Sequence, residues 1–179
     1  MTIYLPYEFS NEHKDAHLSK IEQNQEIINA LFEWVKNPKN ILFFCGNVGT
    51  GKSYFCSAFK NHIKEKKLNI RDYSEQYFFS ELKQTIQMDW DPLRRIKDIC
   101  ECEYVILDDM GSSKMTEWQK EMLSEFIDLR YSSGLPTLIT SNLDRSGIRN
   151  EFTPRFYSRL FAEKNVIIEQ DGHDRRHPS

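Results

Sequence analysis

The sequence lacks any apolar run that approaches the roughly 20 residues needed to span a bilayer. It also opens without a basic segment followed by an apolar core, which is the pattern of a secretory signal. The first absence argues against a membrane protein or a membrane partner, and the second argues against export. The expected compartment is therefore cytoplasmic.

Cysteine is scarce, with four residues in 179, at Cys45, Cys56, Cys100 and Cys102. Cys100 and Cys102 form a close pair, but no second pair and no suitably spaced histidines complete a zinc site. In a reducing cytoplasm we expect all four thiols to stay free and to fill the core as small apolar side chains.

Positive charge is not in excess, because the formal net charge is −3. The chain as a whole is therefore not a basic nucleic-acid-coating protein, and DNA contact would need a local patch. Arg94, Arg95 and Lys97 cluster on a short helix expected after Asp91-Pro92 and could touch a nucleic-acid backbone. An ordinary solvated helix face is the alternative interpretation of these charges.

The most informative feature that the sequence does contain is a glycine-rich segment, which directly follows an apolar run at residues 41–45. The segment consists of Gly46, Asn47, Val48, Gly49, Thr50, Gly51, Lys52 and Ser53. Glycines let backbone N–H groups curl around an anion, the lysine can reach outer phosphates, and the serine hydroxyl can ligate a magnesium ion. The segment therefore predicts a phosphate-binding loop at the start of a helix.

A second apolar strand, expected at residues 104–107, ends in the carboxylates Asp108 and Asp109. Ligands of parallel α/β sheets gather at the carboxyl ends of strands. Asp108 is thus placed to hold the metal, directly or through water, and Asp109 to orient or deprotonate a water that attacks a γ-phosphate. A mere turn before Gly111 would explain the acidity but not the fully apolar strand.

Three further segments follow in order. Thr116 has capping-box spacing to Gln119 and predicts a long helix that stops at Gly134. The strand after it ends near Asn142, whose amide can contact the γ-phosphate or the attacking water. Thr153-Pro154 predicts an N-cap, after which Arg155 and Arg159 share one helix face.

Near the N-terminus, apolar residues at helical spacing predict one helix from Leu18 to Val35.

These blocks occur together in one order: GNVGTGKS, VILDDMG, TEWQKEMLSEFIDLRY, LPTLITSNL and RFYSRL. In that order they resemble the DnaC/DnaI/IstB group of AAA+ ATPases, which is related to DnaA. The resemblance implies an α/β fold, an AAA+ P-loop NTPase core with a central, mostly parallel five-stranded sheet and helices on both faces. It also implies the cofactors ATP and Mg²⁺ and self-assembly into an oligomer with ATP sites between subunits.

The resemblance implies roles for individual residues. Lys52 and Ser53 match the Walker A lysine and magnesium-binding hydroxyl. Asp108 and Asp109 match the Walker B pair, with Asp108 and Ser53 on the metal, and Asn142 matches sensor 1. Arg159 matches the arginine finger that reaches a neighbouring subunit, and Arg155 is the second candidate. Arg176 is the nearest match to a sensor 2 arginine, with no or only a minimal C-terminal lid expected.

The expected organisation has three parts: an extended segment and helix at 1–37, an AAA+ ATPase core at 38–170, and a polar tail at 171–179. The residues before the phosphate loop leave no room for the separate helicase-binding domain usual in loaders. A short phage-like member, or the ATPase core of something longer, is therefore expected.

The leading functional hypothesis is an ATP-hydrolysing helicase loader that binds single-stranded DNA and a replicative helicase in DNA replication. An IstB-like transposition helper ATPase, acting on duplex DNA with a transposase, is the alternative. A small P-loop nucleoside or nucleotide kinase is a second alternative.

Overall fold

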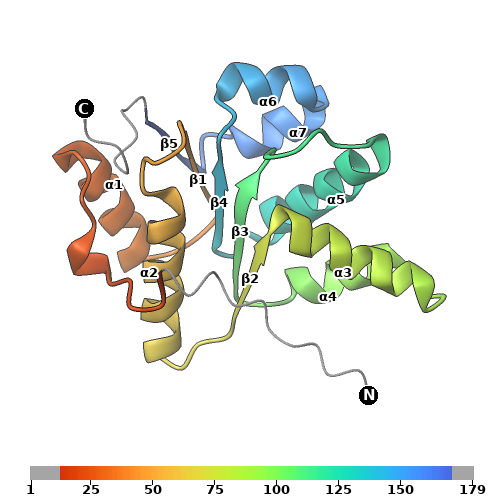
Figure 1. Ribbon diagram of the computed structural model, residues 1–179, viewed down its shortest axis with the longest axis horizontal. Helices are drawn as coiled ribbons and strands as arrows, with labels where there is room; N and C mark the ends of the chain where they lie inside the picture. The colour runs from red at the N-terminus through yellow and green to blue at the C-terminus, as the bar shows by residue number, and fades with distance from the viewer. Residues whose placement is uncertain (1–12, 171–179) are drawn as a thin grey trace.

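Five strands form one sheet in the computed structural model, which describes residues 13–170 (Figure 1). The strands are β1 (Ile41–Gly46), β2 (Ile70–Ser74), β3 (Tyr104–Met110), β4 (Thr137–Ser141) and β5 (Val166–Gln170). They lie in the order β2-β3-β4-β1-β5, and every neighbouring pair is parallel. The expected five-stranded parallel sheet is confirmed.

Helices cover both faces of this sheet, as expected (Figure 1). One face packs against α1 (Gln25–Lys36) and α2 (Lys52–Glu65). The other packs against helices of the later chain: α3 (Glu75–Gln87), α4 (Pro92–Cys100), α5 (Glu117–Ser133), α6 (Arg145–Glu151) and α7 (Pro154–Leu160). Both faces of the sheet are apolar because side chains alternate along each strand. In β1, Leu42 and Phe44 pack on the face covered by α1 and α2, while Ile41, Phe43 and Cys45 pack on the other face.

The predicted helix ends agree with the structure. Thr116 and Gln119 form a complete capping box at the start of α5, and Gly134 ends this helix in a left-handed conformation with φ 66°. Asp91 caps α4, with Pro92 in the first turn. Thr153 caps α7, with Pro154 in its first turn.

The N-terminal helix differs from the prediction. Instead of one helix from Leu18 to Val35, the chain forms a single 3₁₀ turn (Leu18–Lys20), an extended stretch, and then α1. The Asn24 side chain accepts a hydrogen bond of 2.8 Å from the Ile27 N–H and so starts a new helix at this point. Residues 1–12 and the tail at 171–179 lie outside the described residues.

Arg130 on α5 is fully buried and ties the amino ends of β3 and β4 together. Its guanidinium donates to the Thr137 hydroxyl at 2.7 Å and to the carbonyls of Cys100 at 2.9 Å and Cys102 at 2.7 Å. The carbonyls of Glu103 and Pro136 accept hydrogen bonds from Arg130 Nη2. Burial lowers its pKa to about 10. Arg130 is therefore a structural cross-link at the edge opposite the phosphate loop.

The four cysteines are free and buried, in agreement with the expectation from the sequence. Burial raises the pKa of the Cys45 and Cys100 thiols to about 12. Across residues 13–170, no helix combines the length and apolarity needed to cross a bilayer.

Candidate nucleotide site

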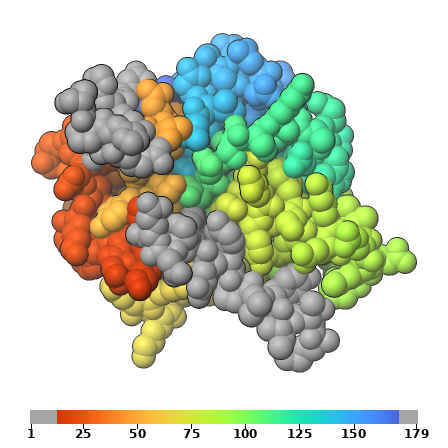
Figure 2. Space-filling model, viewed as in Figure 1, coloured from red at the N-terminus to blue at the C-terminus, as the bar shows by residue number. Residues whose placement is uncertain are grey.

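Three predicted groups meet at the carboxyl edge of the sheet. Strand β1 leads into the phosphate loop, β3 carries the two aspartates just before its last residue, and Asn142 follows β4 directly. Since β3, β4 and β1 are consecutive in the sheet, their carboxyl ends lie side by side (Figure 1). Figure 2 shows the orange segment of the phosphate loop at the surface, and Val48 at its tip is 54% exposed.

The loop needs glycine at both ends. Gly51, which caps α2, has φ 89°, a left-handed conformation that other residues adopt at a cost. At Gly46, φ is 154°, and a side chain there would collide with the Gln170 carbonyl at the end of β5. The glycines thus let the loop turn tightly between β1 and α2, whose positive end then faces an anion.

Lys52 lies inside the loop and is 6% exposed. Its Nζ donates to the carbonyl oxygens of Gly46 at 2.7 Å and Asn47 at 2.8 Å. Burial lowers the pKa of Lys52, while the negative charges of Asp109 and Asp108 act in the opposite direction. The ammonium is therefore held where a phosphate enclosed by the loop would neutralise it.

A β-bulge carries the two aspartates. Leu107 pairs with Ile139 and Met110 with Ser141, so β3 uses one more residue than β4 over this interval. Asp109 has a left-handed backbone with φ 62°. In a regular strand the two carboxylates would point to opposite faces. Here the negative charges of both aspartates raise the pKa of Lys52.

Thr140 on β4 holds this bulge together. Its buried hydroxyl donates to Asp108 Oδ1 and accepts a hydrogen bond of 2.9 Å from the Asp109 N–H. The Cys56 thiol on α2 also donates to Asp108 Oδ1, at 3.5 Å. Both donors use the same oxygen, and Oδ2 of the buried Asp108 accepts no hydrogen bond from residues 13–170. Thr140 and Cys56 were not predicted as site residues.

Asp109 is bound by Asn142, whose Nδ2 donates to Asp109 Oδ1 at 2.8 Å. Burial and the neighbouring Asp108 raise the pKa of Asp109, whereas Lys52 and the Asn142 amide lower it. A carboxylate whose pKa lies above its usual range is a better proton acceptor than a free aspartate. The pair is suited to orienting and deprotonating a water molecule.

The site fits a magnesium nucleotide better than a protein-only metal centre. Within residues 13–170, no group of three or more His, Cys, Asp or Glu side chains could hold a metal ion. Mg²⁺ is commonly bound by one or two protein oxygens together with substrate phosphates and water. Ser53 is exposed in the first turn of α2, and its hydroxyl and the Asp108 carboxylate are the protein oxygens that could hold such an ion.

The two arginines on α7 are held elsewhere. Arg155 Nη2 lies 2.6 Å from Asp128 Oδ2, and Arg159 Nε lies 3.3 Å from Asp128 Oδ1. The Arg159 guanidinium also stacks 4.6 Å from the centre of the Tyr131 ring. In the described part of the chain, neither arginine contacts the phosphate loop, the aspartates or Asn142. Arg176 lies outside the described residues.

Residues 7–152 match the family of IstB-like ATP binding proteins. The chain belongs to this family. The family is described as ATP-binding, and the chain is also similar in sequence to the helicase loaders DnaI and DnaC.

Among curated relatives of this IstB-like chain is the replicative helicase loader DnaI of Bacillus subtilis (strain 168). It is 28% identical over 152 residues, which are 76% of this chain and 48% of DnaI. The replicative helicase loader DnaC of Buchnera aphidicola subsp. Baizongia pistaciae is 23% identical over 163 residues, which are 88% of this chain and 64% of that protein. The chain thus spans about half to two thirds of these relatives.

Solved structures show the same fold. A crystal structure of the DnaC helicase loader gives a TM-score of 0.74 at 23% identity, covering 89% of this chain and 99% of that chain. The replication initiator DnaA, bound to AMPPCP and single-stranded DNA, gives 0.74 at 19% identity, covering 88% of this chain and 50% of that chain. The predicted AAA+ P-loop fold is confirmed.

One further contact of this IstB-like site was missed from the sequence. Gln23 Nε2 donates to the Thr50 carbonyl at 2.6 Å, and Gln170 Nε2 donates to Gln23 Oε1 at 2.7 Å. The two glutamines connect the segment before α1 and the end of β5 to the phosphate loop. They are 147 residues apart, so no local pattern could have indicated the pair.

Proposed function

We propose that this chain binds ATP with Mg²⁺ and hydrolyses it. The observation that carries the proposal is the meeting of Lys52, the Asp108-Asp109 bulge and Asn142 at one sheet edge. In this scheme Asp109 accepts a proton from a water that Asn142 helps to orient, and Lys52 stabilises negative charge on the phosphates.

Ser53 and Asp108 would hold the magnesium ion, directly or through water. The ion supplies positive charge that offsets the charge of the phosphate oxygens. Thr140 and Cys56 keep Oδ1 of Asp108 engaged, so the other oxygen serves the metal. Hydrogen bonds of this kind fix the orientation of a ligating carboxylate.

The hydrolysis scheme is tested with Asp109→Asn. The amide side chain cannot accept the proton, so ATP turnover should be lost while ATP binding is retained. Asp98→Asn is the control, because Asp98 lies on α4 with an exposed side chain and, among residues 13–170, only a 4.0 Å ion pair to Arg95. Full turnover by Asp109→Asn would reject Asp109 as the base.

The active unit is proposed to be an oligomer of this chain, with Arg159 of one subunit completing the ATP site of the next. The Arg159 side chain is 39% exposed and that of Arg155 is 74% exposed, so α7 presents guanidinium groups at the surface. An arginine supplied by a neighbouring molecule is worth roughly 10³ to 10⁵ in rate in GTPases.

The cellular role we propose is loading a replicative helicase onto single-stranded DNA. Support comes from the relatives named as replicative helicase loaders. The surface formed by Trp90, Arg94 and Lys97, called the α3–α4 tip, is the proposed DNA contact, because Trp90 is 61% exposed and Arg94 and Lys97 are exposed next to it on α4. Arg95, in contrast, is paired with the buried Glu81, with Nε 2.5 Å from Oε1. Exposed aromatic and basic side chains together suit single strands.

This role is tested by DNA binding at several salt concentrations and by affinity capture of a purified hexameric helicase. Replacing Arg94 and Lys97 with Glu should weaken single-strand binding and flatten its salt dependence. Lys66→Glu, at the exposed C-cap of α2, is the control. Unchanged DNA affinity in the double variant would remove the tip from the proposal, and failure to bind any replicative helicase would reject helicase loading.

The transposition helper remains the second candidate, because the matching family is described as IstB-like. It predicts preferred binding to duplex DNA and capture of a transposase rather than a helicase. The kinase alternative predicts transfer of the γ-phosphate to a nucleoside or nucleotide in a substrate panel. Release of inorganic phosphate alone, stimulated by DNA, would argue against the kinase.

A further inference from the structure

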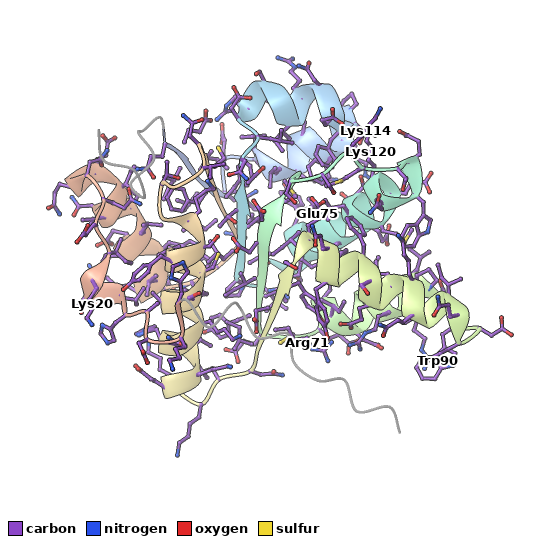
Figure 3. All side chains as sticks on the ribbon, in the orientation of Figure 1. Lys20, Arg71, Glu75, Trp90, Lys114 and Lys120 are labelled. Carbon is purple, nitrogen blue, oxygen red and sulfur yellow. The ribbon has the colours of Figure 1, made fainter. Side chains whose placement is uncertain are left out.

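A buried glutamate contacts the loop that follows the two aspartates. Glu75 is the first residue of α3, directly after β2, and it is 1% exposed. Its carboxylate accepts hydrogen bonds from the Gly111 N–H and, at 2.8 Å, from the Ser113 hydroxyl. Figure 3 shows Glu75 at the beginning of α3, beside the carboxyl end of β3.

The two groups that Glu75 binds come two and four residues after Asp109. Between them, the Ser112 N–H donates to the Asp109 carbonyl at 3.2 Å and closes a tight turn. Gly111 has φ 79°, and a side chain there would press into Leu143. Asp109 is therefore fixed from both directions: Thr140 holds its N–H, and Glu75 holds the turn that begins at its carbonyl.

A favourable charge at a helix start does not explain this arrangement. Acidic side chains at helix N-termini are favourable while remaining in solvent. Glu117, the first residue of α5, is such a case, with a side chain that is 88% exposed. Burial of a carboxylate is costly unless its oxygens are satisfied, and both oxygens of Glu75 are satisfied by the loop after Asp109.

We propose that Glu75 is a positioning residue for ATP hydrolysis, which sets the carboxylate of Asp109 by fixing the turn from Gly111 to Ser113. The inference rests on the proposed ATPase function. Glu75 itself touches neither nucleotide nor water in this scheme. Its loss should therefore impair the chemical step more than nucleotide binding, because the phosphate loop keeps its own contacts.

The test compares Glu75→Ala and Glu75→Gln with Glu117→Ala as the matched control. In Glu75→Ala, kcat should fall about tenfold or more, because misplacement of a reacting group by about 1 Å can cost 10²-fold. The dissociation constant for ATP should change by less than about threefold, which separates loss of transition-state contacts from loss of binding. Glu117→Ala should leave both quantities unchanged.

Glu75→Gln should restore most of the turnover. The glutamine oxygen can accept from the Gly111 N–H, and its NH₂ group can donate to Ser113 if the hydroxyl rotates. Hydrogen exchange gives a second readout that does not depend on turnover. Exchange at Gly111 should be faster in Glu75→Ala than in wild type, and near wild type in Glu75→Gln.

Three results would overturn the inference. The first is wild-type kcat in a folded Glu75→Ala. The second is a parallel fall of kcat, ATP affinity and melting temperature without recovery in Glu75→Gln, which would make Glu75 merely structural. If Glu75→Ala does not fold, Ser113→Ala is measured in its place. The third result is then an unchanged kcat in Ser113→Ala. Absence of turnover in wild type, with any DNA, would instead reject the ATPase proposal and this inference with it.

Discussion

The Asn142 amide donates a 2.8 Å hydrogen bond to Asp109, which joins the residue after β4 to the bulged end of β3. The bond lowers the pKa of Asp109, against the larger upward effects of burial and Asp108. Asn142 therefore influences both the position of the Asp109 carboxylate and the pH at which it ionises.

Asn142→Ala should shift the acid limb of the curve of kcat against pH to higher pH. The substitution removes a contact that lowers the pKa of Asp109, so the base becomes protonated at a higher pH than in wild type. The loss in turnover should consequently be larger at low pH than at high pH. Asn150→Ala, an exposed position on α6, is the control. A uniform loss at every pH would contradict this prediction.

Asp109→Asn should raise the melting temperature near neutral pH. The pKa of Asp109 is raised in the folded protein, so its ionised form costs stability at pH values above the folded pKa. As the pH falls through that value, wild-type Asp109 takes up a proton and the cost disappears. The advantage of the variant should therefore shrink on acidification. Thermal melting at several pH values measures it, and an advantage that grows on acidification would refute the sign.

Lys52→Ala should reduce ATP turnover by about 10²-fold or more, the scale for losing a preorganised electrostatic contact. The variant should remain folded, because within residues 13–170 the hydrogen bonds of Lys52 Nζ go only to the loop residues Gly46, Asn47 and Thr50. Lys66→Ala, at the exposed far end of α2, is the matched control. Equal turnover in the two variants would remove Lys52 from the site.

Arg159→Ala should lose turnover alone and regain it when mixed with Lys52→Ala. In mixed assemblies, the Lys52→Ala subunit supplies an intact Arg159 to a neighbour with an intact phosphate loop. Arg155→Ala is measured alongside it, because Arg155 is the second candidate for the finger and pairs with the same carboxylate, Asp128. Failure to recover activity on mixing would show that Arg159 does not act between subunits, and full activity of Arg159→Ala alone would exclude it as the finger.

Arg130→Met should destabilise the fold by about 3 kcal/mol or more, because it leaves several buried carbonyls without a donor. Chemical denaturation measures the change. Arg94→Met provides the comparison, since Arg94 is exposed on α4 and should change stability by less than about 0.5 kcal/mol. Similar values for the two variants would contradict the role assigned to Arg130.

Much of the fold could be predicted because its signals are local. A capping box such as Thr116 with Gln119 spans three residues, and the loop from Gly46 to Ser53 carries its glycines, lysine and hydroxyl in one segment. The N-terminal helix is predicted too long because apolar side chains at helical spacing, Ile21 and Ile28, lie on both sides of residues 22–24, whereas the break there depends on a single capping side chain, Asn24.

The sequence by itself determined the family, the phosphate loop and the order of the strand-end residues, because these depend on spacing along the chain. The tertiary structure alone decided the shape of the site. Thr140 is 31 residues from Asp109 and 32 residues from Asp108 in the sequence, yet it stabilises the bulge that they form. Glu75 contacts Gly111, which is 36 residues away in the sequence. Such contacts follow from which strands become neighbours in the sheet, and strand order depends on packing of the whole core rather than on any segment.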